Sequence, residues 1–461
     1  MDKHRTRRWL VASIAAVMLI PLGAAPGLLH AGTAPVTLNF IAADFPEYDA
    51  FVNAANRIGK PMGIQIQKNF VNFDDVQKKV LLDFTARNRN WDLVFLYSPW
   101  TVSFASKGVL SPIDEFLTTP AARTLVNTKD FVPVTSELTY QGKLWSMPYL
   151  SAPWMLGYRK DLYEHAGERQ AFKTKHGYDL APPQTYKQLL DIARFFTRKK
   201  GETLAGRTLD DDFYGFVIAN KKGFMFNRYQ NILVAFGADL LFNPKTMRPT
   251  YDSPESLAAL KYYTDLYKTM PPGSDNMTGG ESTRFAAQGR VSTVLTVLDI
   301  MYSIFEDQKT SKVVGKFAYA LLPTQMASRP HAMAVDANGI GIYSLSPRKA
   351  AAFRLLSETL STRGLKEVIK EYPEYPAMRL SILNDPQVRG AKPALYQAMS
   401  LASTAKMYRF SFPQLPEWPQ LVDLAQDAVL AAVNGQKTPE QALADAQAQM
   451  VEIFKRAGHI K

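Results

Sequence analysis

The stretch GKLWSMPYLSAPWMLGYRKDLYEHAG, residues 142–167, decides how this chain is interpreted. Its apolar residues alternate as in a strand on both sides of the prolines. A proline disfavours helix in the residue before it, so residues 146–154 are expected to follow an extended path. The stretch holds no cysteine and no acid–base pair that would suggest catalysis. It therefore predicts an extended structural segment with many aromatic rings.

Strands and amphipathic helices alternate around this stretch. VTLNFIA (36–42) and WDLVFLY (91–97) are typical strands, and FDDVQKKVLLDFTARN (73–88) between them predicts a helix with an aspartate cap. Ser253, Ser346 and Thr438 each precede a proline, as a capping hydroxyl does at a helix start, and Thr438 with Gln441 forms a capping box. This order of elements predicts layered α/β architecture.

Length and composition limit the class of protein. A chain of 461 residues favours two lobes, each with its own core. Hydrophobic residues at 46% and charged residues at 21% are ordinary globular values, which argues against disorder and against a polytopic membrane protein. No internal repeat or low-complexity linker divides the chain.

The N-terminus predicts export. Residues 1–31 combine a basic start with an apolar run that Pro21 interrupts, the pattern of a signal peptide. Cleavage is expected between residues 25 and 34, and TRRWLV weakly resembles a twin-arginine signal, so the Sec and twin-arginine routes both stay open. The alternative is a retained transmembrane helix, which Pro21 and the nearby glycines disfavour. Without a lipid-anchored cysteine, the expected location is the periplasm.

Charge and cysteine count exclude several kinds of site. The chain has no cysteine, so it has no disulfide, thiol nucleophile or thiolate metal site. The first 31 residues hold four Lys/Arg and one Asp, so +9 of the net charge of +12 belongs to the remainder, where it is dispersed. Nucleic-acid binding is not expected without a basic stripe. The histidines beyond the signal are scattered, and we expect no metal and no cofactor.

Successive segments along the chain resemble one family. They are DLVFLYSPWTVSFASKGVLSPIDEFL (92–117), GKLWSMPY (142–149), LGYRKDLYEHAG (156–167), APPQTYKQLLDIARFFT (181–197), FGADLLFNP (236–244), SPESLAALKYYTDLY (253–267), FAAQGRVSTVLTV (285–297), SPRKAAAFRLLSETLST (346–362) and GQKTPEQALADAQAQM (435–450). This order is similar to that of the family 1 extracellular solute-binding proteins, the maltose-binding-protein-like receptors of ABC importers. The resemblance implies an α/β, two-lobed periplasmic-binding-protein fold (type II, or Venus-flytrap) with a multi-segment hinge.

The resemblance also implies domain boundaries. The N-terminal lobe would comprise residues 35–150 and 336–372, and the C-terminal lobe residues 151–335 and 373–461. Three crossovers would join them, at residues 146–154, 335–344 and 370–379, where Gly339 and Gly341 could absorb backbone rotation.

Receptors of this kind close around a carbohydrate or polyol and then dock on a membrane permease. A sugar site needs flat apolar rings and polar partners for the hydroxyls. The candidate ligand contacts are Asp44, Phe45, Tyr48, Tyr97, Trp100, Trp154, Asp299, Tyr302, Asn338, Gly339, Arg379 and Trp418.

Each candidate has a structural alternative. Asp44 could be a helix cap, and Trp100 and Trp154 could belong to the core, which for Trp418 is the better interpretation. Many relatives carry a sugar-stacking tryptophan where this chain offers Asp299 and Tyr302, which leaves the carbohydrate type in doubt.

Other functions remain open at this stage. A receptor of the same shape could bind a polyamine or a metal chelate, or feed a chemosensor. A secreted enzyme acting on glycosides needs two carboxylates held across a sugar, which sequence alone does not exclude, but no nucleophile motif supports it. We expect a monomeric binding protein that is not an enzyme.

Overall fold

The computed structural model describes residues 35–325, 332–333, 335–403, 406–407, 415 and 417–461. Residues Val36–Lys461 form one compact unit, built on a nine-stranded sheet. Its strands are β1 (Val36–Ala43), β2 (Ile64–Val71), β3 (Leu93–Tyr97), β4 (Leu110–Ser111), β7 (Met147–Arg159), β10 (Tyr214–Ile218), β13 (Val291–Val297), β14 (Phe317–Ala320) and β16 (Val335–Tyr343). Seven of them follow the order β10-β13-β7-β16-β3-β1-β2, while β14 pairs with β7 and β4 with β16.

The long strand β7 connects two groups of strands. Its residues 147–153 pair antiparallel with β16, and residues 154–159 pair antiparallel with β13 and β14. On one side, β1 runs parallel to both β2 and β3; on the other, β10 runs parallel to β13. The extended path predicted for residues 146–154 is confirmed, and it lies inside a continuous sheet.

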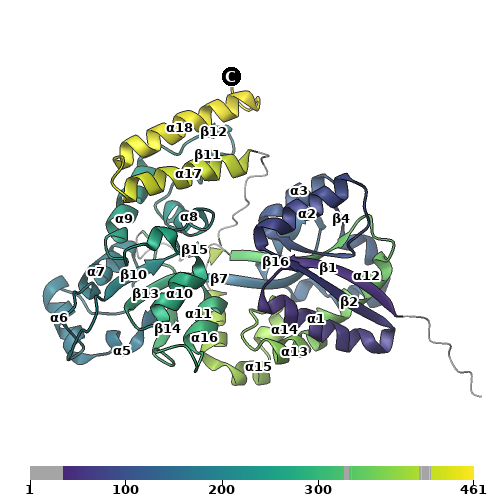
Figure 1. Cartoon of the computed structure of the whole chain (residues 1–461), viewed down its shortest axis with the longest axis horizontal. Helices are drawn as coiled ribbons and strands as arrows, with labels where there is room; N and C mark the ends of the chain where they lie inside the picture. Colours follow the sequence, from purple (N-terminus) through teal and green to yellow (C-terminus); the bar gives the residue numbers. More distant parts are fainter. Residues whose placement is uncertain (1–34, 326–331, 334, 404–405, 408–414, 416) are drawn as a thin grey trace, which may run out of the picture. The chain divides into compact units, whose positions relative to one another are not determined.

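Each group of strands has its own helices (Figure 1). Around the first lie α1 (Pro46–Gly59), α2 (Phe73–Thr85), α3 (Thr101–Ser106), α12 (Lys349–Thr359) and α13 (Thr362–Glu371). Around the second lie α7 (Tyr186–Phe196), α8 (Phe226–Ala235), α9 (Pro254–Tyr267), α10 (Gly279–Ala287), α11 (Leu298–Phe305) and α16 (Pro393–Ala402). The hairpin of α17 (Trp418–Val433) and α18 (Pro439–Arg456) packs on α9.

Shorter elements complete the described chain. They are α4 (Pro120–Val126), α5 (Lys160–Tyr163), α6 (Ala166–His176), α14 (Leu380–Leu383) and α15 (Pro386–Ala391), and the two-residue strands β5 (Thr139–Tyr140), β6 (Lys143–Leu144), β8 (Thr203–Leu204), β9 (Arg207–Thr208), β11 (Phe242–Asn243), β12 (Arg248–Pro249), β15 (Ala332–Met333) and β17 (Lys406–Met407). Six short 3₁₀ helices cover residues 60–62, 98–100, 113–116, 128–130, 133–138 and 274–276.

Local rules predicted some helix starts and missed others. The Ser253 hydroxyl caps α9, and Thr438 with Gln441 forms the capping box of α18, as predicted. The Ser346 prediction is wrong: α12 begins at Lys349, while the Ser346 hydroxyl bonds to the carboxylate of Asp92 at 2.5 Å. The cap of α2 is Asn72 and makes no side-chain capping bond, so the predicted aspartate cap is also wrong.

The three predicted crossover segments lie side by side. Strands β7 and β16 are neighbours, and the segment before Arg379 runs along β7, where the Ser151 amide donates to the Pro376 carbonyl at 3.2 Å. The Tyr375 hydroxyl donates to the backbone oxygen of Tyr149. These bonds hold the third segment against the sheet.

Gly339 and Gly341 have a packing role in this arrangement. A Cβ on Gly339 would lie 2.1 Å from the Ser146 hydroxyl oxygen, and one on Gly341 would lie 2.7 Å from a methyl carbon of Leu110. Only glycine permits such close approach. A β-bulge between Asn338 and Gly339 marks the same point of β16.

Candidate ligand-binding site

Four aromatic side chains gather where the parallel strands of the first group end. Phe45 follows β1, Phe73 follows β2, and Tyr97 and Trp100 lie at and just after the end of β3. The Phe73 ring centre lies 6.2 Å from that of Phe45, 5.4 Å from Tyr97 and 5.3 Å from Trp100. We call these four residues the aromatic cluster. Open α/β sheets bind their ligands at the carboxyl ends of strands, which is where the cluster lies.

The cluster leaves aromatic surface uncovered. The Phe45 side chain is 41% exposed, and the other three rings are half-buried. Phe45 stacks on Phe73 with an interplanar angle of 27°, whereas Trp100 is fixed from beneath by Phe95 and Phe104. A rigid layer of rings therefore supports one exposed ring. Sequence analysis missed Phe73 because it counted this residue only as the start of a helix.

The second group of strands contributes residues at the carboxyl end of β10. The Asn227 amide nitrogen on α8 donates to the Tyr97 hydroxyl oxygen at 3.2 Å, which connects the two groups directly. Phe224, just before α8, is 37% exposed, and its carbonyl accepts a bond from the Arg228 guanidinium at 2.7 Å. Neither Phe224 nor Asn227 was predicted. Their position a few residues after a strand was the signal available in the sequence, but only the folded sheet shows that this strand runs parallel to its neighbour.

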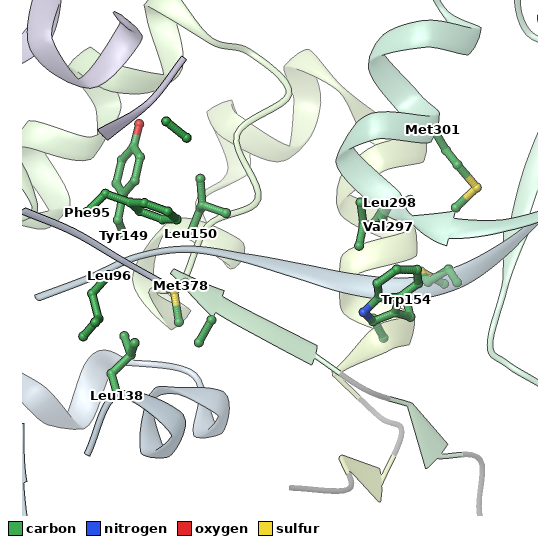
Figure 2. Close-up of a cluster of buried hydrophobic side chains, with 14 of the residues drawn as sticks. Phe95, Leu96, Leu138, Tyr149, Leu150, Trp154, Val297, Leu298, Met301 and Met378 are labelled. Carbon is green, nitrogen blue, oxygen red and sulfur yellow. The ribbon is translucent and has the colours of Figure 1, made fainter. Parts of the chain in front are cut away.

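Trp154 is a core residue. It is 2% exposed and lies in register with Val297 of β13, and the Arg228 guanidinium carbon sits 4.7 Å from the centre of its ring. Figure 2 shows Trp154 on β7, beside Val297 of β13 and Leu298 of α11. The structure thus packs Trp154 as a core residue, and its contact with a ligand stays a prediction.

Asp44 and Tyr48 belong to the same turn but differ in burial. Asp44 is exposed at the end of β1, and its backbone amide donates to the Val71 carbonyl at 2.9 Å. Tyr48 is fully buried, two residues inside α1, and its ring packs against Phe95 and Tyr149. Asp44 therefore remains a candidate contact, whereas Tyr48 supports α1 from within the core.

Glu47 and Asp299 form an acidic pair, with Glu47 on a helix of the first group of strands and Asp299 on a helix of the second. Burial raises the pKa of Glu47, in the first turn of α1, to about 8, and the Asp299 carboxylate on the first turn of α11 adds to the increase. Tyr302, one turn further along α11, is buried under the Lys392 ammonium, which lies 5.5 Å from its ring centre. Burial raises the pKa of the Tyr302 hydroxyl. Glu47 was not predicted.

The remaining candidates lie on or beside the crossovers. Asn338 of β16 is paired with Tyr97 of β3 on one side and with Leu150 of β7 on the other, and its side chain is half-buried. Its amide oxygen has no hydrogen-bond partner among the described residues. Gly339 is buried by the packing described above. Trp418 begins α17 and is buried against Phe226, with ring centres 5.8 Å apart, as the core interpretation predicted.

Arg379 has a structural role that the sequence did not indicate. It is 1% exposed, and its guanidinium donates to the carbonyls of Leu360 and Val126 at 2.7 and 2.8 Å and to the Asp130 carboxylate at 3.2 Å. The guanidinium carbon also lies 4.4 Å from the Phe131 ring centre. These partners occupy its guanidinium in this structure, and ligand contact at Arg379 stays a prediction.

The described residues offer neither a metal site of side chains nor a membrane-spanning helix. No group of three or more histidine, cysteine or acidic side chains within the described ranges could hold a metal ion. In the same part of the chain, no helix is both long and apolar enough to cross a bilayer.

The fold is that of the two-lobed solute-binding proteins. It is similar to the crystal structure of an ABC transporter solute-binding protein from Agrobacterium radiobacter K84 in complex with ribitol, with a TM-score of 0.74 and 22% identity, covering 91% of this chain and 99% of that one. A solute-binding protein from Agrobacterium vitis S4 with bound D-mannitol gives the same TM-score and identity, covering 92% of this chain and 100% of that one.

Sequence comparison defines the family. The model of the bacterial extracellular solute-binding protein family matches residues 42–364, so this chain belongs to that family. The mannitol-binding protein of Pseudomonas aeruginosa is 24% identical over 404 residues, which cover 84% of this chain and 85% of that protein. The resemblance found in the sequence is thereby confirmed.

Proposed function

We propose that this chain is the substrate-binding receptor of an ABC importer, and that it takes up a carbohydrate or polyol between its two lobes and delivers it to a membrane permease. The observation that carries the proposal is the aromatic cluster at the carboxyl ends of β1, β2 and β3, with one ring exposed. Flat aromatic surface suits the C–H faces of sugars and polyols. The ribitol, mannitol and mannitol-binding relatives support the same class of solute.

The proposed contacts come from both lobes. In the N-terminal lobe they are Asp44, Phe45, Tyr97, Trp100 and Asn338, to which we add Phe73. In the C-terminal lobe they are Asp299 and Tyr302, with Phe224 and Asn227 added. Buried hydroxyls of the solute would need the polar members of this set, because an unpaired buried hydroxyl costs more than a typical hydrogen bond gains.

We propose the lobes predicted above, residues 35–150 with 336–372 and residues 151–335 with 373–461, with one refinement. Asp130 accepts hydrogen bonds from the amide of Ser381 at 2.8 Å and from its hydroxyl at 2.6 Å, and also binds Arg379. These contacts support extending the N-terminal lobe through α14. The end of the third crossover segment would then belong to the N-terminal lobe, and the chain would pass to the C-terminal lobe only after α14.

Solute uptake would work by population shift. A solute favours closure because only the closed form contacts it from both lobes, and reversing a 1:99 preference takes about 5.5 kcal/mol of differential affinity. A few rings and hydrogen bonds supply an energy of that order. No chemical step is part of this proposal. We further propose that the protein is exported to the periplasm after removal of an N-terminal signal peptide, and that it acts there as a monomer.

A thermal-shift screen tests the proposal. The panel holds pentitols, hexitols, mono- and disaccharides, uronates, polyamines and metal chelates. A solute at 100 times its dissociation constant adds about 2.7 kcal/mol, which raises the melting temperature of a chain this size by roughly 3 °C. Stabilisation by a sugar or polyol alone supports the proposal. Stabilisation only by a polyamine or chelate would show a receptor for another solute, and turnover of a glycoside would show an enzyme.

A further inference from the structure

A hollow lies on the N-terminal part of the chain, and no residue of the aromatic cluster lines it. It is a groove of about 590 Å³ between the end of β2 and the later turns of α2, with Phe70, Val71, Leu82, Ala86 and Trp91 supplying its apolar lining. Leu82 is 70% exposed, the most exposed of the large hydrophobic side chains in the described part of the chain. Nothing in the proposed solute site uses this groove. We call it the β2–α2 groove.

Basic side chains surround the groove. Lys79 lines it, and Lys78, Arg87 and Arg89 are exposed on α2 and the loop that follows. None of these four has an ion pair with a carboxylate among the described residues.

Of the acidic side chains of α2 that the structure describes, only Asp83 lines the groove; Asp75, one turn before Lys78 and Lys79, is half-buried and does not line it. Asp83 is buried and accepts a hydrogen bond from the Asn90 amide at 2.6 Å. The exposed charge around the apolar lining is therefore positive. The face combines exposed apolar surface with several unpaired cations.

That combination fits one kind of partner best. An apolar side chain that enters the boundary between head groups and acyl chains, flanked by Lys and Arg, is how peripheral proteins attach to anionic lipid. We propose that the β2–α2 groove docks on a membrane surface containing anionic phospholipid, with Leu82 inserted and the four basic side chains on lipid phosphates. Docking of this kind would hold the receptor beside the membrane whether or not a solute is bound.

A strand of another protein is the alternative occupant, and absence of vesicle binding in the test below would favour it. Strand β2 is at the edge of the sheet and pairs only with β1 among the described strands. A strand of another protein could add to such an edge. The charge around the groove favours lipid, because a row of backbone groups does not require four cations.

Vesicle flotation tests the proposal with the chain begun at Pro35, which retains the compact unit and removes the apolar N-terminal run. The vesicles contain either 30% phosphatidylglycerol in phosphatidylcholine or phosphatidylcholine alone, at low and high salt. We expect binding to the anionic vesicles only, weaker at high salt. No binding, or equal binding to both vesicles, would overturn the proposal.

Variants locate the contact. Each lysine near an anionic surface contributes about five-fold in affinity, so the double change Lys78→Glu with Lys79→Glu should weaken binding at least about 25-fold. Leu82→Gln should weaken it about ten-fold or more, since the apolar insertion is lost. Both changes are on exposed positions, and an unchanged melting temperature confirms that the variants fold.

The matched control changes net charge equally at a distant site. Lys309→Glu with Lys312→Glu reverses two exposed lysines of the C-terminal part. We expect less than a three-fold effect from this pair. Equal weakening by both pairs would mean a net-charge effect and would overturn the proposal, as would vesicle binding that Leu82→Gln leaves unchanged. Solute affinity, measured separately, reports on the proposed solute site alone.

Discussion

The substitution Phe45→Ala tests the proposed solute site most cleanly, because it separates ligand contact from fold stability. Phe45 is 41% exposed, so a bound solute can still cover about two fifths of the ring. Full burial of a phenylalanine is worth about 1.5–3 kcal/mol, which makes the exposed fraction worth roughly 1 kcal/mol, and favourable ring stacking adds to it. We expect the dissociation constant to rise about 5- to 30-fold, corresponding to about 1–2 kcal/mol.

Isothermal titration with the solute identified in the screen gives the affinity, and urea unfolding gives the stability. The free energy of unfolding should fall by about 1 kcal/mol or less, because among the described residues Phe73 alone has its ring within stacking distance of Phe45. Two control variants are measured with it, one for solute affinity and one for stability. Leu82→Ala removes a more exposed apolar side chain on α2 and should leave solute affinity within two-fold, whereas Tyr48→Ala removes a buried ring and should cost about 3–5 kcal/mol of stability. Unchanged solute affinity in the Phe45→Ala protein would refute the aromatic cluster as the binding surface.

Three further predictions concern stability. Burial raises the pKa of Glu47 to about 8 from its usual 4.5, so the folded protein holds this proton more tightly than the unfolded chain; stability is greatest below pH 4.5 and falls toward pH 8. Glu47→Gln should remove about 2–4 kcal/mol of that decrease in urea unfolding at pH 5 and pH 8, and an identical pH profile in the variant would contradict the assignment. Arg379→Leu should cost about 3–5 kcal/mol, because the Asp130 carboxylate would lose its ion-pair partner and keep only its bonds from Ser381; a loss below 1 kcal/mol would show that this network contributes little to stability. Gly339→Ala should cost about 1–3 kcal/mol by overpacking, and Ser146→Gly in the same chain should recover at least half of that cost; no recovery would place the strain elsewhere.

Local patterns predicted the parts of the fold that depend on neighbours in sequence. The extended crossover at residues 146–154 and the caps at Ser253 and Thr438 follow from proline and hydroxyl chemistry within four residues. The order of many such elements was enough to identify the family. The cap predicted at Ser346 failed because α12 begins only at Lys349; the Ser346 hydroxyl instead accepts a bond from the Arg348 amide and donates to the distant carboxylate of Asp92.

Side-chain roles were harder to predict because they depend on distant contacts. Phe45 and Tyr48 are three residues apart, yet one is exposed and the other buried, because α1 begins between them and turns Tyr48 inward. Arg379 looked like a ligand contact in a proline-rich segment. Two of its partners, Val126 and Asp130, lie about 250 residues earlier, and no local pattern reports them.

The residues missed by the sequence follow the same logic. Phe73, Phe224 and Asn227 each lie just after a strand that runs parallel to a neighbour. Strand direction is a property of the folded sheet, so it could not be assigned with certainty before the structure. Given that direction, the carboxyl ends of the strands identify all three as candidates.

Small-angle X-ray scattering with and without the solute that stabilises the chain tests the central claim most directly. The account predicts a smaller radius of gyration in the presence of solute, because a solute held by Phe45 on one lobe and by α8 or α11 on the other draws the lobes together. An identical scattering curve at saturating solute, confirmed as bound by calorimetry, would contradict closure around the solute.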